Sequence, residues 1–144
     1  MKKQLFAVAA ATLIYFASAA VCQAQQPMLS VNIPFEFQAG NKILPPGEYR
    51  IETVYPGAGT LQRLLQVNGS ASTVISTLPL EAKHGTPEPK LMFHRYGDSF
   101  FLTQIWTGES MGRQLFESNR EKEISRWEGS GELALLLHPT DVRP

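Results

Sequence analysis

Cysteine is almost absent from this sequence, because Cys22 is the only one among 144 residues. It stands near the N-terminus, in a segment that we expect to be removed. The rest of the chain would then contain no disulfide and no thiol chemistry. Its stability must come from a packed core, for which Leu, Ile, Val and Phe are plentiful.

Groups that bind metals or act as nucleophiles are also few. The chain has three histidines, and Asp98 and Asp141 are its two aspartates. His84, His94 and His138 have neither the i, i+4 spacing of a helical metal site nor the alternate spacing of one strand face. We therefore predict no metal site and no cofactor.

Clusters of basic residues are missing as well. The 13 Lys and Arg residues balance 13 Asp and Glu residues, and removal of Lys2 and Lys3 leaves the remainder mildly acidic. A surface without a basic stripe cannot neutralise a run of phosphates, and it offers no patch for anionic lipids. Nucleic acid is therefore not an expected partner.

What is present begins with the pattern of a secretory signal. Two lysines precede an uncharged apolar run over residues 5–16. Small side chains at Cys22 and Ala24 suit the two pockets that a signal peptidase reads. We predict cleavage after Ala24, which makes residues 1–24 a signal peptide and residues 25–144 a single β-rich domain of ordinary size. The mature protein would be secreted or periplasmic, with no transmembrane segment.

Two alternatives concern the same N-terminal segment. The apolar run and its flank approach the roughly 20 residues that a spanning helix needs, so the segment could stay as an uncleaved anchor, although its many alanines make it only moderately hydrophobic. Cys22 could instead carry a lipid. A lipid signal requires a small residue before the cysteine, and Val21 is β-branched. Both alternatives are weaker than cleavage after Ala24.

The remaining chain is predicted to form short strands joined by turns. Residues 30–37 alternate apolar and polar side chains, and Pro34 places that strand at a sheet edge or bends it. Proline and glycine at 45–47 form a turn, and a strand follows at 48–53.

A second hairpin is predicted further along the chain. Asn68 and Gly69 indicate a type I′ turn, because both residues tolerate the positive φ that this turn requires. The turn would join a strand at 60–67 to one at 72–78.

The segment from Lys90 to Trp106 is predicted to be a hairpin whose turn fixes its register. Gly97 and Asp98 suit a two-residue type II′ turn with glycine first. Paired side chains share a face of the hairpin. The predicted pairs are Tyr96–Ser99, Arg95–Phe100, His94–Phe101, Phe93–Leu102 and Met92–Thr103.

Both faces of this hairpin are rich in apolar side chains, which indicates that it is covered on both sides. The predicted faces are Leu91, Phe93, Phe100, Leu102 and Trp106 on one side, and Met92, Tyr96, Phe101 and Ile105 on the other. Some of the rings could form a ligand-binding surface, with stacking faces for a glycan or an apolar lining for a lipid. The candidate residues are Phe93, Tyr96, Phe101 and Trp106. Core packing is the alternative for all four.

A short helix is predicted near the C-terminus. Ser118 and Glu121 form a capping-box pattern, and the helix should extend to about Trp127 before a glycine-rich stop at 129–131. The apolar run at 133–137 is read as a last strand, with a helix as the alternative. Many short strands between Gly and Pro turns predict a mainly β fold, namely a small antiparallel β-sandwich or barrel with one short C-terminal helix.

Two blocks of sequence carry a resemblance to known proteins. One runs from Val31 to Phe37 and then through the Leu-Pro-Pro-Gly-Glu-Tyr turn to Ile51, and the other lies between Lys90 and Trp106. In these blocks the chain resembles short exported proteins of soil bacteria that have no assigned function. The resemblance implies export and one β domain, and it implies no activity.

One local grouping, His94 with Asp98 and Ser99, could suggest a base oriented by a carboxylate near a hydroxyl. The predicted register argues against it. Asp98 lies in the turn, where it would bond nearby backbone, while His94 lies opposite Phe101. We therefore expect no catalytic residue and no enzyme.

The sequence thus favours an exported, non-enzymatic β domain that acts by binding or assembly in the cell envelope or outside the cell, with a protein, glycan or lipid as partner. A small β-barrel carrying an apolar ligand is the alternative. It requires an internal cavity lined by residues such as Phe93, Phe101, Leu102 and Trp106. A small hydrolase is third, and it requires His84 or His94 in a cleft within hydrogen-bond reach of Asp98 or a glutamate.

Overall fold

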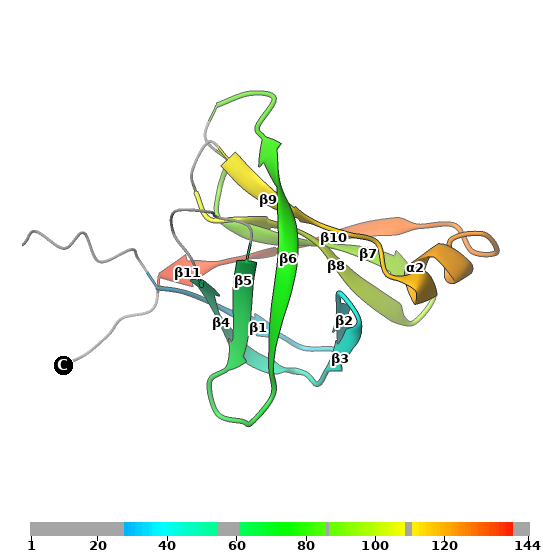
Figure 1. Ribbon diagram of the computed structural model, residues 1–144, viewed down its shortest axis with the longest axis horizontal. Helices are drawn as coiled ribbons and strands as arrows, with labels where there is room; N and C mark the ends of the chain where they lie inside the picture. The colour runs from blue at the N-terminus through cyan, green and yellow to red at the C-terminus, as the bar shows by residue number, and fades with distance from the viewer. Residues whose placement is uncertain (1–27, 55–60, 86, 109–110, 140–144) are drawn as a thin grey trace, which may run out of the picture.

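A computed structural model describes residues 28–54, 61–85, 87–108 and 111–139, and the predicted signal peptide lies outside these ranges. The described chain forms strands and one short helix (Figure 1). The elements are β1 (Leu29–Ile33), β2 (Phe37–Ala39), β3 (Lys42–Leu44), β4 (Gly47–Thr53), β5 (Leu61–Gln66), β6 (Ser72–Glu81), β7 (Lys90–Tyr96), β8 (Ser99–Trp106), β9 (Met111–Leu115), α2 (Asn119–Ile124), β10 (Gly131–Leu136) and β11 (His138–Pro139).

The predicted mainly β fold with a short C-terminal helix is confirmed. The strands form one sheet in the order β10-β7-β8-β9-β6-β5-β4-β1-β11; β2 joins it through β8, and β3 is attached through β2. The pairing of β2 with β8 is parallel, so the sheet is mixed where an antiparallel one was predicted. The sheet is also open, and the predicted sandwich or barrel is not confirmed.

Strand β6 joins the two halves of the sheet. Residues Ser72–Ser76 pair with β5, and residues Thr77–Glu81 pair with β9. Figure 1 shows β6 crossing from one group of strands to the other. Because β9 ends at Leu115, β5 is the only strand of the described ranges that pairs with the first half of β6.

The predicted strand at 30–37 is interrupted at Pro34, and the chain bends at the next residue, Phe35. Strand β1 ends at Ile33 and β2 begins at Phe37. β1 pairs with β4, whereas β2 pairs with β3 and β8. Proline has no N–H to donate to a ladder, so the chain leaves one half of the sheet at this residue without losing a donor.

The hydrophobic core is built from both halves of the sheet. The ring of Phe37 meets Tyr49 and Phe93 edge-on, with centroid distances of 5.3 and 5.6 Å. Such aromatic pairs contribute about 0.5–1.5 kcal/mol beyond their buried area. Tyr49 is 0% exposed, and its hydroxyl donates to the carbonyl of Pro45 at 2.6 Å. The buried hydroxyl therefore has a hydrogen-bond partner, and its burial does not carry the cost of an unpaired polar group.

The β7–β8 hairpin has the predicted turn position and most of the predicted register. Gly97 has a φ of 55°, and every pair from the turn as far as Phe93 is confirmed. The predicted pair of Met92 with Thr103 is wrong. A β-bulge between Met92 and Phe93 places Met92 opposite Gln104 instead.

This bulge reverses the direction of the side chains at the end of β8, because one extra residue inverts the alternation between the two faces of the sheet. Ile105 therefore joins Phe93 in the core, where both are 0% exposed; the predicted faces had separated them. Trp106, predicted on the face of Phe93, is buried outside the core cluster. There its ring lies against Gly112, and its Nε1 donates to Gln104 at 2.9 Å.

The β5–β6 hairpin is confirmed, but its turn is not type I′. The backbone N–H of Gln66 donates to the carbonyl of Ala71 at 2.9 Å, so residues 67–70 form the loop. A type I′ turn requires positive φ at both central residues, and Gly69 does not have it. The apolar run predicted as a strand at 133–137 does form one, β10, which spans Gly131–Leu136. It is not the last strand, because the short β11 follows it.

Candidate functional site

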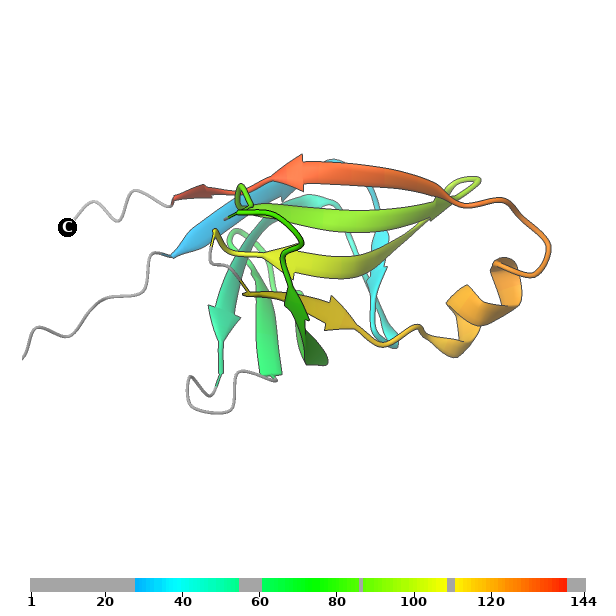
Figure 2. The ribbon, with the colours of Figure 1, turned by 90° about the horizontal axis from the view of Figure 1, so that it is seen from above.

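Helix α2 lies at the end of the molecule where β7 turns into β8 (Figure 2). The Ser118 hydroxyl accepts a hydrogen bond from the N–H of Glu121 at 3.1 Å. The predicted cap at Ser118 is therefore confirmed. The helix ends at Ile124, short of the predicted Trp127.

Glu121 also connects the helix to the sheet. Its Oε1 lies 2.9 Å from Nδ1 of His94 on β7, and Glu121 is only 3% exposed. Burial is the main cause that raises the pKa of Glu121, and Glu117 adds to it, while His94 and the Ser118 backbone oppose it. Burial likewise raises the pKa of Tyr96 on the same face, with smaller contributions from Glu121 and Glu117.

The four rings predicted as a ligand surface have little exposed area. Phe93 belongs to the core cluster, and Trp106 covers Gly112. The rings of Tyr96 and Phe101 meet edge-on, with centroids 5.7 Å apart. Tyr96 is also close enough to Glu121 for that carboxyl to raise its pKa. The largest exposed fraction among the four rings is the 8% of Trp106. These rings contribute mainly packing in the described structure.

No group of three or more His, Cys, Asp or Glu side chains within the described ranges could hold a metal ion. His84 and His138 are exposed, and His94 is half-buried beside Glu121. No helix among the same residues is long and apolar enough to cross a membrane.

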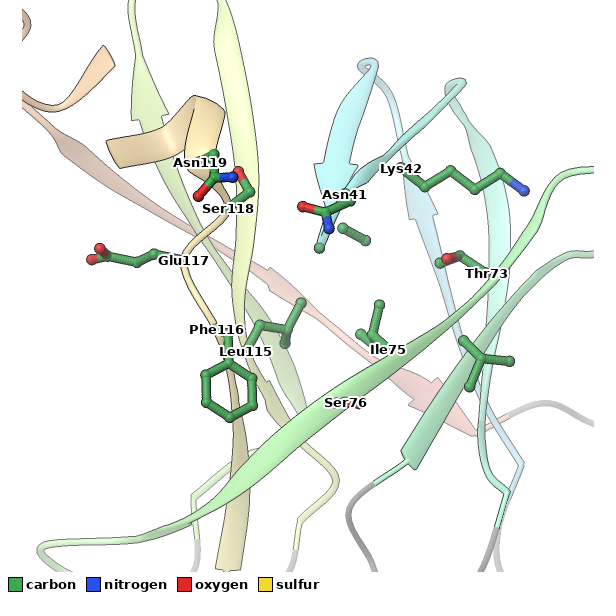
Figure 3. A pocket seen from close by; sticks show the side chains of 13 residues that line it. Asn41, Lys42, Thr73, Ile75, Ser76, Leu115, Phe116, Glu117, Ser118 and Asn119 are labelled. Carbon is green, nitrogen blue, oxygen red and sulfur yellow. The ribbon is translucent and has the colours of Figure 1, made fainter. Parts of the chain in front are cut away.

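A polar-lined groove of about 480 Å³ lies between segments that are distant in the chain. Three segments surround it, and we call it the β6 groove: the β2–β3 turn at 39–42, the first half of β6 at 73–76, and the connection from β9 to α2 at 115–119. Figure 3 shows Asn41 on one side and Ser118 with Asn119 on the other.

The floor and the rim of the β6 groove differ in character. Ile75 and Leu115 are buried and point into the gap between the strands (Figure 3). At the rim, Val74 is 50% exposed and Phe116 is 57% exposed. An occupant would therefore meet an apolar floor, an apolar rim and the amide and hydroxyl groups between them.

A second hollow of about 520 Å³ continues from the β6 groove past the start of β6. It shares Lys42, Thr73 and Val74 with the groove and adds Arg63, Leu65 and Ser72. The Nζ of Lys42 donates to the carbonyl of Ser72 at 2.6 Å. Arg63 lies 3.9 Å from Glu52, at the limit of an ion pair. Lys42 forms no ion pair with a carboxylate of the described residues, so its charge at this end of the groove is not neutralised.

Scans of protein-family models, curated proteins and solved structures found no match to this chain.

Sequence reasoning missed the β6 groove because its three walls are distant in the chain. One local signal was available. In the predicted strand at 72–78, Val74 and Leu78 alternate in phase with Ser72 and Ser76, and both apolar side chains are about half exposed. Apolar residues in the outward phase of a strand indicate a surface that something else can cover.

Proposed function

We propose that this protein is exported and acts by binding a partner protein in the cell envelope or outside the cell, without catalysis. The β6 groove is the observation that carries the proposal, because it combines an apolar floor with polar walls and an open rim. Such a combination suits recognition, since apolar area supplies affinity and a few polar groups supply orientation. The signal pattern and the resemblance to short exported proteins support the location.

The alternative of an apolar ligand inside a barrel receives less support. It needs an internal cavity lined by Phe93, Phe101, Leu102 and Trp106. Phe93 and Leu102 belong to the core cluster of the described residues. Phe101 does reach a hollow, but that hollow is about 120 Å³, well below the usual size of a ligand pocket, roughly 300 Å³ or more.

The hydrolase remains a second candidate because one of its two requirements is met. His94 has a glutamate within hydrogen-bond distance, a pairing that can orient a general base. The cleft is the missing requirement, since neither His94 nor Glu121 lines any of the three hollows described above. Hydrolysis of a p-nitrophenyl ester that is abolished by His94→Gln would revive this candidate.

The test of the proposed function places a photo-cross-linking amino acid at Phe116 in the full chain, produced in the organism of origin. A matched chain carries the same group at Trp127, which is 87% exposed and lies outside the β6 groove. We expect a discrete cross-linked partner from position 116 and none from position 127. N-terminal sequencing should find Gln25 as the first residue. A correctly exported chain without a cross-link from position 116 would contradict binding at the groove.

A further inference from the structure

We propose that the occupant of the β6 groove is an extended peptide of the partner protein, which adds to the sheet as a strand along the open edge of β6. This inference rests on the proposed binding function and specifies how the partner is recognised. It follows from the direction of backbone groups, from the side chains around them, and from the charge at one end of the groove.

The direction of the backbone groups follows from two hydrogen bonds. The carbonyl of Ala71 accepts from Gln66 and so points toward β5, whereas the carbonyl of Ser72 accepts from Lys42 on the groove side. Successive residues of a strand direct their N–H and C=O to opposite edges. Val74 and Ser76 therefore direct theirs into the groove.

No strand in the described part of the chain pairs with these outward groups. β9 pairs with β6 only from Thr77 onward, and the chain leaves the sheet after Leu115. An added strand would lie where β9 would continue if it did not turn toward α2. It would then run antiparallel to β6, as β9 does, and residues 72–76 would offer it an edge of about 17 Å. A peptide backbone matches the alternating donors and acceptors of such an edge.

The side chains around the edge favour an apolar peptide. Residues of an added strand would alternate between the floor, formed by Ile75 and Leu115, and the rim, where Val74 and Phe116 are about half exposed. Side chains on both faces of the peptide strand would therefore contact apolar surface. β-branched residues fit such a pleated surface best.

The charge at one end of the groove specifies one side chain of the peptide. Lys42 and Arg63 lie near Ser72, and no carboxylate of the described residues forms an ion pair with Lys42. The carboxyl-side end of an antiparallel strand reaches this end of the groove, so an acidic side chain is expected there. Lys42 now covers the carbonyl of Ser72, as lysines commonly protect an open strand edge, and the acidic side chain would draw it away.

The test begins with heptapeptides selected from a random library on the exported chain. Binding is then measured for the wild type and for Val74→Pro and Val74→Thr. The Val74 N–H points into the groove, so proline removes one donor without breaking a bond to β5, whereas threonine keeps both the donor and the branched shape. We expect about a tenfold loss of affinity for Val74→Pro, the equivalent of one hydrogen bond, and little loss for Val74→Thr.

A second measurement does not depend on the folding of any variant. A selected peptide is N-methylated either at one set of alternate amides or at the other set, since only one set can face β6 in an added strand. We expect one methylated form to lose binding and the other to keep it. The amides of Val74 and Ser76 should also become protected from hydrogen exchange when peptide binds.

The charge at the end of the groove is tested separately. Selected peptides should carry an acidic residue near the carboxyl end, and their affinity should fall for Lys42→Gln.

Several results would overturn strand addition. These are the absence of any selected peptide, equal binding of the two methylated forms, or unchanged exchange at Val74 and Ser76. Binding of a glycan panel in a manner that depends on Phe116 would also overturn it and identify another class of partner. A cross-link from position 116 together with any of these results would leave the proposed function standing and remove only the strand-addition mechanism.

Discussion

Nδ1 of His94, on β7, lies 2.9 Å from Oε1 of Glu121, on α2, and this contact joins two elements that are 27 residues apart. The backbone N–H of Glu121 donates to the Ser118 hydroxyl that caps the helix. One buried residue therefore both takes part in the cap and holds the helix against the hairpin. Its protonation state should affect how firmly α2 is docked.

The stability of the protein should depend on pH through Glu121. Burial raises its pKa above the ordinary 4.5, so the folded chain holds this proton more tightly than the unfolded chain. The free energy of unfolding should therefore fall as the pH rises from about 4.5 through the raised pKa, the opposite of the usual behaviour of a paired carboxylate. Urea unfolding at several pH values over this range should show the decrease in the wild type. The decrease should be absent in Glu121→Gln. Glu123→Gln, at an exposed position of the same helix, is the control. An equal slope in all three proteins would contradict this role.

The N-terminal cap of α2 should be worth a measurable amount of stability. Ser118→Ala removes the hydroxyl that accepts from the Glu121 N–H, and we expect a loss of about 1 kcal/mol in the free energy of unfolding. Ser125→Ala is a matched control, because that exposed hydroxyl donates to the Lys122 carbonyl at the other end of the helix. Equal effects of the two substitutions in chemical denaturation would show that the cap has no special role.

Local patterns in the sequence predicted the features that depend on neighbouring residues. The turn at Gly97 and the cap at Ser118 could be read directly, because a positive φ favours glycine and a capping box has fixed spacing. The interruption of the strand at Pro34 also follows from one residue, because proline lacks a backbone donor. Each of these signals lies within a few residues of its effect.

Features that depend on distant residues could not be predicted in this way. No local signal indicates the bulge beside Met92, so Ile105 and Trp106 were placed on the wrong faces. His94 was compared with Asp98, which is near in sequence, whereas its carboxylate partner is Glu121 on another element. The β6 groove exists because β9 turns away after Leu115 while β6 continues. Tertiary packing decides all three, and periodicity carries no information about it.

The conformation of Gly97 predicts a strong dependence on residue type. Its φ is 55°, and a β-branched side chain there would strain the backbone by roughly 1–2 kcal/mol. Gly97→Val should therefore lower the melting temperature clearly. Gly97→Asn should lower it less, because asparagine tolerates this region of φ. Both substitutions add a Cβ near the Glu128 carboxylate, so the difference between them reports on the backbone. Equal melting temperatures for the two variants would contradict the turn geometry.

The contact between Gly112 and Trp106 predicts a substitution effect that the sequence does not suggest. A Cβ at Gly112 would lie 2.6 Å from Cε3 of Trp106, so Gly112→Ala must displace the indole ring. We expect a loss of about 1–3 kcal/mol, as for other overpacked sites. We also expect a red shift of tryptophan emission, measured in a Trp127→Phe background so that Trp106 alone reports.

Two comparisons separate this contact from a general effect of the added methyl group. Gly129→Ala should be harmless, since a Cβ there meets nothing within 4 Å. In a Trp106→Leu background the cost of Gly112→Ala should shrink, because the smaller side chain leaves room for the methyl, and the double-mutant cycle then measures the coupling of the two residues. If the cost of Gly112→Ala is the same with either residue at position 106, the ring does not limit position 112, and the placement of Trp106 across β9 would have to be revised.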